Sequence, residues 1–363
     1  FTVYVESQGS HAMRERLAGS LGVEEKNIKV VTNDVGGGFG LKMMCFPEYV
    51  ATMFASRVLQ RPVKWTSTRS EAFLSDSHGR DHVTEASIAM DKEGNFLGVK
   101  VDTVAAVGAY LSQYGIFIPT LAGAGMHVGV YKIPVLYNKV NVVYTNTVPV
   151  DAYRGAGRPE ASYVIERLVD KAADDLGIDP VELRVKNFVQ PDEIGKHEGA
   201  ILPLDSCDFK KTTEMSMVNS SYDDFLKRKE ESKLENKLRG IGISSYIERT
   251  QGEGAENSRV VISGEGSVKV FAGTQATGQG HETAWTQILV EKLGVNPEDV
   301  SIHFGNSDDL PGGGGTGGSK SLYMAAGAIN DASNAMLKKG IEIAANELEA
   351  SIDEIEYTTD AGP

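Results

Sequence analysis

Clustered glycine constrains the fold of this chain more than any other feature of its sequence. The chain has 40 glycines among 363 residues, against an average glycine content of about 7%, and many of them gather in four loops. These loops cover residues 34–42, 152–160, 277–283 and 311–321, and each follows a β-like run and precedes a helix-like run. Because glycine permits positive φ and close approach of the backbone to a ligand, the sequence predicts strand–loop–helix units whose loops contact a ligand.

The spacing of apolar residues predicts the elements around these loops. We expect helices over residues 11–21, 47–59, 225–238, 281–293 and 323–348, and a further helix from Pro159 to the stop at Gly177. Strands are expected at 28–31, 240–246, 258–262 and 268–272, with a hairpin formed by 83–90 and 96–104. On the helix that ends at Gly177, the acidic side chains Glu166, Asp170 and Asp174 are expected to be solvated.

This mixture predicts an α+β fold with two domains, each of mixed or antiparallel sheet and packed helices. We place the first domain at residues 1–195 and part of a second at 196–363, because an irregular polar stretch lies near 195. Neither half has the pattern of a doubly wound parallel sheet.

Composition excludes several classes of function. The formal net charge of −14 opposes binding to nucleic acid or to anionic lipid. Cys45 and Cys207 form no CxxC pair, so the chain is not expected to hold an iron–sulfur cluster or a structural zinc itself. No apolar run approaches the roughly 18 residues of a membrane span, and a cytoplasmic location is the default expectation. A chain that starts at Phe1 is expected to begin inside a larger gene product or to start after processing.

The first two loops suggest anion sites, each with an alternative. Loop 34–42 could cradle a phosphate or dinucleotide, but Leu41 or Met43 stands where the dinucleotide fingerprint needs its third small residue, so a tight structural turn is equally compatible. Loop 152–160 carries Arg154 and Arg158 at the start of a helix, an arrangement that favours anion binding. Surface salt bridges are the simpler alternative for these arginines.

The sequences of the last two loops do not match two well-known motifs. Trp285 stands where a zinc-protease motif starting at His281 needs its second histidine, and Ser319 stands where a phosphate-binding loop needs its lysine. His281 is therefore more plausibly a capping or structural residue, while the Gly278–Gly280 backbone suits a polar cofactor. Loop 311–321 resembles a flexible linker in composition, yet it crowds hydroxyls and Lys320 beside a helix start.

Taken together, the sequences of the four loops and their order along the chain resemble those of a known enzyme family. GGGFG-x-K, AYRGAGRPE, GQGHET and GTGGSKS resemble the successive signature loops of the molybdopterin-binding large subunits of molybdenum hydroxylases, the xanthine dehydrogenase and aldehyde oxidase family. The likeness extends to residues 61–65, 69–71, 165–170, 182–184 and Asn187. Within the family the chain looks most like the large subunit of aerobic carbon monoxide dehydrogenase.

Two departures bear on the substrate. Gly155 stands where enzymes of this family that oxidise carbon monoxide carry a copper-binding cysteine, and Met43 stands where the purine enzymes have a glutamate. The resemblance therefore implies hydroxylation of an aldehyde or an N-heterocycle with oxygen derived from water. A carbon monoxide dehydrogenase and a noncatalytic cofactor-binding domain are the alternatives.

The resemblance also implies roles for individual residues. Phe39 and Gly40 would act in catalysis beside the metal ligands, and Arg154 would polarise the substrate or fix the metal-side loop. No residue is expected to ligate the metal directly. The cofactor is expected to be a molybdenum–molybdopterin, with the cytosine dinucleotide form as an alternative to the plain one. Contacts with it are expected from Gly37, Gly38, Phe39, Gly40, Arg154, Gly155, Thr277, Gly278, Gln279, Gly280, His281, Thr316, Gly317, Ser319 and Ser321.

The resemblance finally implies partners. Electrons would leave through an iron–sulfur subunit and an FAD subunit. The family's catalytic base is a glutamate in a late Gly-Glu segment that this sequence does not contain. We therefore expect either a fragment or a split subunit that is inactive by itself. In the second case another large-subunit half would supply the glutamate.

Overall fold

The chain folds into two compact units, which are described separately. A computed structural model describes residues 1–196, 203–250 and 255–359. Unit 1 combines residues 1–73 with residues 249–363, and unit 2 comprises residues 74–248. The prediction of domains at 1–195 and 196–363 followed the order of the sequence, whereas the units follow contacts in space; that domain division stays a prediction.

The N-terminal part of unit 1 is a small strand–helix–strand motif. Strands β1 (Thr2–Tyr4) and β2 (Lys29–Val31) pair in parallel, and α1 (Ser10–Leu21) connects them. Met13 and Leu17 bury one face of α1, and the helix ends at Gly22, whose φ of 64° only glycine adopts readily. Helix α2 (Pro47–Leu59) begins at a proline and is followed by α3 (Arg69–Ser75).

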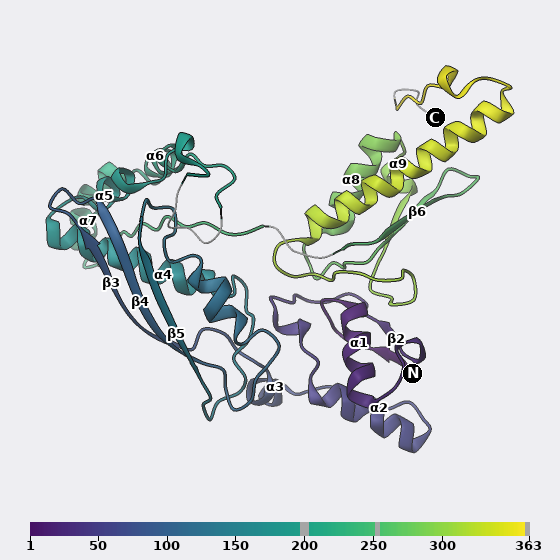
Figure 1. Cartoon of the computed structure of the whole chain (residues 1–363), viewed down its shortest axis with the longest axis horizontal. Helices are drawn as coiled ribbons and strands as arrows, with labels where there is room; N and C mark the ends of the chain where they lie inside the picture. Colours follow the sequence, from purple (N-terminus) through teal and green to yellow (C-terminus); the bar gives the residue numbers. More distant parts are fainter. Residues whose placement is uncertain (197–202, 251–254, 360–363) are drawn as a thin grey trace. The chain divides into compact units, whose positions relative to one another are not determined.

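The C-terminal part of unit 1 is a three-stranded mixed sheet packed against two helices (Figure 1). Strands β6 (Ser258–Ile262) and β7 (Val268–Ala272) are antiparallel, and β7 and β8 (Val300–His303) are parallel. Helices α8 (His281–Leu293) and α9 (Ser321–Glu347) supply Trp285, Leu289 and Ile329 to the core.

Backbone contacts join the two parts of unit 1. Val31 forms a β-bridge with Asn306, and the Thr32 N–H donates to the Gly305 carbonyl at 2.8 Å. The Ser307 hydroxyl accepts a hydrogen bond from the Val30 N–H at 2.9 Å. The segment after β8 therefore runs beside β2, which brings the ends of distant strands into one neighbourhood.

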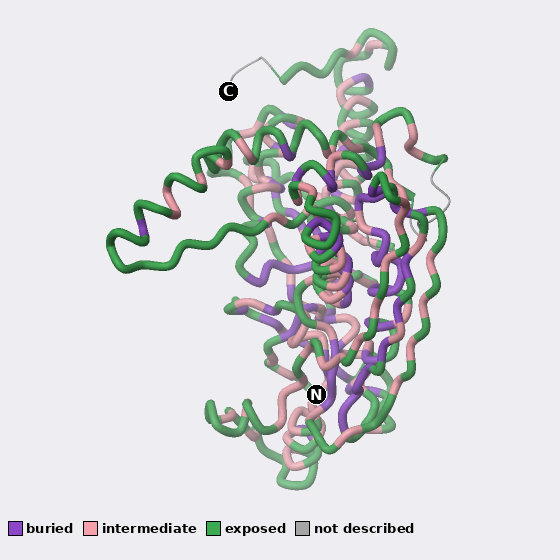
Figure 2. Tube along the Cα trace, turned by 90° about the vertical axis from the view of Figure 1, so that its left-hand side faces the viewer, coloured by how far each residue is buried: buried purple, intermediate pink, exposed green. Residues whose placement is uncertain are grey.

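Unit 2 is a three-stranded sheet covered by helices. Strands β3 (His82–Met90) and β4 (Phe96–Ala106) form an antiparallel hairpin, and β5 (Leu136–Val143) pairs with β4 in parallel. Half-buried and exposed residues alternate along β3 and β5, and Phe96, Val99 and Val101 of β4 are buried in the core, so one face of the sheet packs on the core. Figure 2 colours the buried residues of the chain purple. The helices are α4 (Arg158–Leu176), α5 (Pro180–Asn187), α6 (Phe209–Ser220) and α7 (Phe225–Leu234).

Both units also contain shorter helical segments. A π-helical segment spans Ile118–Gly123 in unit 2. Single 3-10 turns lie at Glu25–Asn27, Leu41–Met43, Pro191–Glu193, Tyr222–Asp224, Pro297–Asp299 and Ile352–Glu354. Among the helices of the described residues, none is long and apolar enough to cross a membrane.

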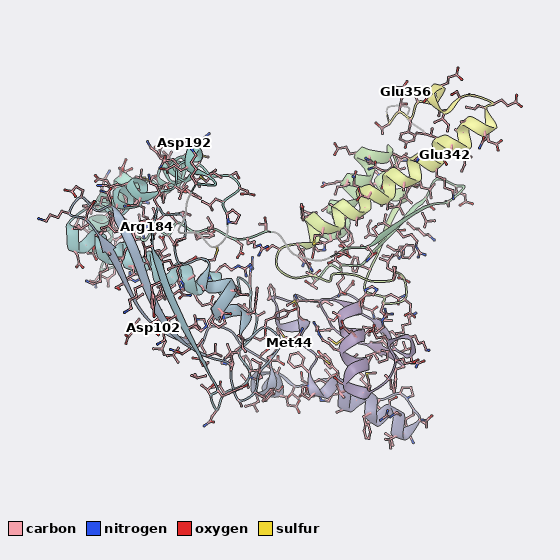
Figure 3. All side chains as sticks on the ribbon, viewed as in Figure 1. Met44, Asp102, Arg184, Asp192, Glu342 and Glu356 are labelled. Carbon is pink, nitrogen blue, oxygen red and sulfur yellow. The ribbon has the colours of Figure 1, made fainter. Side chains whose placement is uncertain are left out.

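Two sequence-based expectations are wrong for one shared reason. Glu166 is not solvated but 5% exposed, and residues 240–246 form no strand. Arg184 is fully buried and its Nε lies 3.0 Å from Glu166 Oε2 (Figure 3 labels Arg184). The Ser245 N–H donates to Glu166 at 2.9 Å, and Arg184 donates to the Ile243 carbonyl at 3.2 Å. The backbone around residues 243–245 thus forms hydrogen bonds with the buried Arg184–Glu166 ion pair instead of with a neighbouring strand.

Candidate functional site

Three of the four predicted loops meet inside unit 1. We call residues 36–40, 274–280 and 312–321 together the loop cluster. The Gly37 N–H donates to the Thr277 carbonyl at 2.9 Å, which ties the first loop to the third. The Thr316 hydroxyl donates to the Gln275 carbonyl, which ties the fourth loop to the third. Loops that are more than 230 residues apart in sequence (277 − 37 = 240) are therefore one site.

Gln8 connects the first loop to the fourth. Its amide oxygen accepts from the Gly40 N–H at 3.0 Å, while its amide nitrogen donates to the Thr316 carbonyl at 2.8 Å. Its main chain donates to the Lys42 carbonyl at 3.0 Å and accepts from the Thr316 N–H at 2.5 Å. The side chain is 4% exposed, so Gln8 is a buried link between two loops.

Uncharged side chains complete the frame of the loop cluster. The Thr274 hydroxyl lies 3.0 Å from that of Thr316 and 3.1 Å from that of Ser321. Gln275 donates to the Ser7 carbonyl at 2.7 Å. These residues are all buried, so the hydroxyls of Thr316 and Ser321 are engaged by protein groups.

The first loop holds an exposed aromatic ring in an unusual conformation. Phe39 has φ 57°, a left-handed value that is uncommon outside glycine, and the residue is 54% exposed. Its ring lies over Gly37, where a Cβ atom would come within 2.4 Å of the ring. Such strain often accompanies a functional site, and here it presents an apolar ring at the surface of the loop cluster.

Unpaired backbone donors line the loop cluster. In the described part of the chain, the N–H groups of Gly38 and Phe39 and of residues 278–280 and 317–319 have no hydrogen-bond acceptor. The two latter groups stand at the N-termini of α8 and α9. Backbone N–H groups and the helix dipole together bind anions and polar cofactors. Beside Gly278 and Gly318, both with positive φ, a Cβ would meet nothing within 4 Å, so a ligand has room there.

Two titratable side chains border the loop cluster. His281 is 6% exposed and stacks on Trp285 at 4.8 Å between ring centroids. Burial lowers the pKa of His281, so the ring is neutral at pH 7, and its Nδ1 is buried without a partner among the described residues. Burial raises the pKa of Glu256, whose carboxylate accepts from the Gly314 N–H at 3.2 Å.

The second loop lies in unit 2 and differs in character. Arg154 is exposed, and its guanidinium has no hydrogen bond or ion pair with any described residue. Arg158 donates to the carbonyls of Gly155 and Ala156, both at 3.2 Å, and pairs with Glu248 at 3.0 Å. The salt bridges expected as an alternative thus involve Arg158, while Arg154 stays available to a ligand.

The structure therefore sorts the predicted site residues into two groups. Residues 37–40, 277–280, 316, 317, 319 and 321 lie in the loop cluster of unit 1 and His281 borders it, while Arg154 and Gly155 lie in unit 2. Gln279 is exposed but turns its amide oxygen onto the Thr277 N–H at 2.5 Å, which leaves its amide nitrogen available. The contacts of these residues with a cofactor stay a prediction.

Sequence reasoning missed Gln8 and Gln275. Gln8 follows β1 and precedes α1, which is the same strand–loop–helix position that marked the four glycine loops. The Gln8 loop has no run of glycines, so its composition does not mark it. The signal that could have found it is its position between a strand and a helix.

Comparison with known proteins shows which cofactor proteins with these domains bind. Family models described as molybdopterin cofactor-binding domains match residues 1–188 and 216–362. The chain belongs to this family. The unpaired donors and the space beside Gly278 and Gly318 fit a large polar cofactor with an anionic group.

Individual relatives agree with the family. The chain is 31% identical to the gamma subunit of the 6-hydroxypseudooxynicotine dehydrogenase complex of Paenarthrobacter nicotinovorans, covering 96% of this chain and 44% of that protein. It is 32% identical to the carbon monoxide dehydrogenase large chain of Hydrogenophaga pseudoflava, covering 99% and 47%. The chain thus spans about half the length of these relatives.

A solved structure confirms the α+β fold. Quinoline 2-oxidoreductase from Pseudomonas putida 86 superimposes with a TM-score of 0.90 at 29% identity, covering 98% of this chain and 47% of that one. The family and the fold therefore confirm the resemblance to molybdenum hydroxylase large subunits.

Proposed function

We propose that this chain is the cofactor-binding part of a molybdenum hydroxylase that oxidises an aldehyde or an N-heterocycle with oxygen derived from water. The observation that carries this proposal is the loop cluster, in which unpaired N–H groups gather at the starts of α8 and α9. The relatives named for pseudooxynicotine and quinoline support an N-heterocyclic substrate.

The loop cluster would hold the cofactor through its backbone. Residues 278–280 and 317–319 would bind the pterin and its phosphate or cytosine dinucleotide tail, with Gln279 and Ser319 adding side-chain contacts and His281 its buried Nδ1. Phe39 and Gly40 would lie beside the metal ligands. Within the described residues no group of acidic, histidine and cysteine side chains could hold a metal ion. The bound cofactor supplies oxygen transfer and takes up two electrons.

The chain's own side chains would handle the substrate. The unpaired Arg154 guanidinium can donate hydrogen bonds to a carbonyl oxygen or a ring nitrogen, which favours charge build-up on that atom during oxidation. The exposed Phe39 ring can pack against a planar substrate and exclude water. Neither side chain is needed to hold its own loop together, because backbone atoms and other side chains do so.

Partners belong to the same proposal. Two relatives are named as a complex subunit and a large chain, which supports assembly with other subunits. The proposed partners are an iron–sulfur subunit and an FAD subunit, and the proposed location is the cytoplasm. A catalytic glutamate would come from the remaining half of the large subunit. The 363-residue chain alone is therefore expected to be inactive.

Carbon monoxide oxidation is a weaker candidate because of Gly155. This glycine has φ 92°, and a Cβ there would come within 2.4 Å of Pro159 Cγ. A copper-binding cysteine at this position would require the loop to change. The structure thus gives a steric reason to favour aldehydes and N-heterocycles.

Isotope labelling tests the reaction class. The enzyme complex would be incubated in ¹⁸O-labelled water with a panel of aldehydes and N-heterocycles, and separately with carbon monoxide. We expect one ¹⁸O atom in the carboxylate or the hydroxylated ring. Oxidation of carbon monoxide alone would contradict the proposal, and a molybdenum-loaded complex that oxidises nothing in the panel would favour a noncatalytic cofactor-binding role.

A further inference from the structure

Arg80 occupies a strained position beside the Arg154 loop. Its φ is 65°, in the left-handed region that a long side chain rarely adopts. The residue follows the His78–Val150 bridge, which aligns the start of the hairpin with the loop. A side chain held in such a conformation is a candidate for a specific role.

The guanidinium of Arg80 contacts three different groups of this loop and of α4. It donates to the main-chain carbonyl of Arg154, and its carbon lies 5.0 Å from the centre of the Tyr153 ring. Its Nε lies 3.8 Å from Glu160 Oε2, and the two side chains are 32% and 14% exposed. A planar guanidinium can serve several acceptors at once, which a lysine ammonium does less well.

Glu160 carries this contact to the start of α4. The same carboxylate oxygen accepts from the Gly157 N–H at 3.0 Å. Gly157 in turn packs so closely on Ile118 and Gly123 that a Cβ would lie 2.5 Å from the Ile118 carbonyl oxygen. The far end of the loop is therefore rigid, and Arg80 connects that end to Arg154.

Arg158 holds the other carbonyls of the loop. Together the two guanidiniums engage the carbonyls of Arg154, Gly155 and Ala156. Arg154 itself contributes nothing to this frame from its side chain among the described residues. Arg80 and Arg158 thus hold the backbone around Arg154, while the Arg154 guanidinium makes no hydrogen bond or ion pair with the described residues.

We propose that Arg80 is a positioning residue that sets the direction of the Arg154 guanidinium through the Arg154 carbonyl, and thereby selects substrates with an oxygen or nitrogen acceptor beside the reacting carbon. This inference rests on the proposed function, in which Arg154 meets the substrate. Loss of Arg80 lets the loop backbone rotate, and misplacement of a catalytic group by about 1 Å can cost about 10²-fold in rate.

A double-mutant cycle in the molybdenum-loaded enzyme complex tests this role. The variants are Arg80→Met, Arg154→Met and the pair, with Arg167→Met on the exposed face of α4 as the matched control, and kcat and KM are measured with an aldehyde and an N-heterocycle. We expect Arg80→Met to lower kcat/KM by about 10²-fold at unchanged molybdenum content. In the Arg154→Met background the further loss should be less than about threefold, because coupled residues are not additive.

The conservative variant sharpens the result. Arg80→Lys keeps the charge for Glu160 but cannot span Glu160 and the Arg154 carbonyl together, so we expect intermediate activity, and added methylguanidinium should partly restore an Arg80→Ala enzyme. Additive losses in the double variant would overturn the positioning role while leaving the proposed function intact. If Arg154→Met itself keeps full activity, the role proposed for Arg154 fails and the inference fails with it.

Discussion

The two units differ in the kind of polar side chain that they bury. In unit 1 the loop cluster is framed by amides and hydroxyls, those of Gln8, Thr274, Gln275 and Thr316. Among the described residues, the buried Asp, Glu, Lys and Arg side chains all lie in unit 2: Asp151, Glu166 and Arg184. Neutral hydrogen bonds thus frame the loop cluster of unit 1, whereas unit 2 contains a buried ion pair.

This difference matches what each region binds under the proposed function. The amides and hydroxyls of this frame add no charge beside an anionic cofactor tail, and burial raises the pKa of the bordering Glu256, which disfavours its charged form. The N–H groups and helix N-termini can therefore attract the tail. In unit 2 the ionic frame fixes a loop that carries a free guanidinium. A neutral hydrogen bond contributes about 1 kcal/mol to the stability of the fold. Removal of one partner of a buried ion pair costs more, because the other charge stays buried without compensation. We therefore expect larger losses of stability in unit 2 than in unit 1.

The largest effect is expected from Arg184→Met in unit 2. This change leaves Glu166 charged and buried without its partner, at a loss of about 3–5 kcal/mol in the free energy of unfolding. Urea unfolding followed by far-UV circular dichroism measures it. Arg167→Met is the control, because Arg167 pairs with Asp170 at an exposed site and should change stability by less than about 1 kcal/mol. Similar values for both variants would remove the contrast between the units.

A pH effect of intermediate size is expected from His127, also in unit 2. Burial, with a contribution from nearby His82, lowers the pKa of His127 to about 4 from 6.5. The unfolded state therefore binds more protons between these values, so stability is full above pH 6.5 and falls as the pH drops toward 4, by at most about 3 kcal/mol.

Hydrogen exchange of peptides from β4 and α4 at pH 7 and pH 5, corrected for intrinsic rates, measures this loss. His127→Gln should flatten the pH dependence, whereas the exposed His303→Gln should leave it as it is. An unchanged slope in the His127 variant would contradict the assignment.

The smallest effect is expected in unit 1, from Gln8→Met. Methionine can neither accept from the Gly40 N–H nor donate to the Thr316 carbonyl, so two neutral hydrogen bonds are lost at a cost of about 1–3 kcal/mol. Amide exchange should rise in both loops 36–42 and 312–318. The exposed Gln287→Met on α8 serves as control, and acceleration in only one loop would show that Gln8 does not connect them.

Much of the local structure was predictable from periodicity, while the buried polar contacts were not. The predicted helices at 47–59 and 281–293 have the observed bounds, because their apolar stripes and flanking proline or glycine act locally. Helices α5 and α6 and strands β5 and β8 were not individually predicted, since their patterns are short or mixed.

The candidate site shows the same division. The glycine loops were visible because positive φ leaves a mark in composition, as at Gly40 and Gly278. Gln8 contacts Thr316, 308 residues away, and Arg80 contacts Arg154, 74 residues away, and a single sequence carries no sign of such contacts. For the same reason Glu166 was predicted to be solvated although Arg184 buries it.

The most direct test of the central claim is the molybdenum and pterin content of the enzyme complex carrying Ser319→Asp. Ser319 is exposed, and its φ of 58° suits aspartate, so the variant should fold while placing a negative charge among the N–H groups at the start of α9. The account predicts loss of most molybdenum and pterin, with both retained in the control Ser351→Asp at the exposed turn after α9. Undiminished molybdenum and pterin in the Ser319 variant would contradict the claim that the loop cluster binds the cofactor.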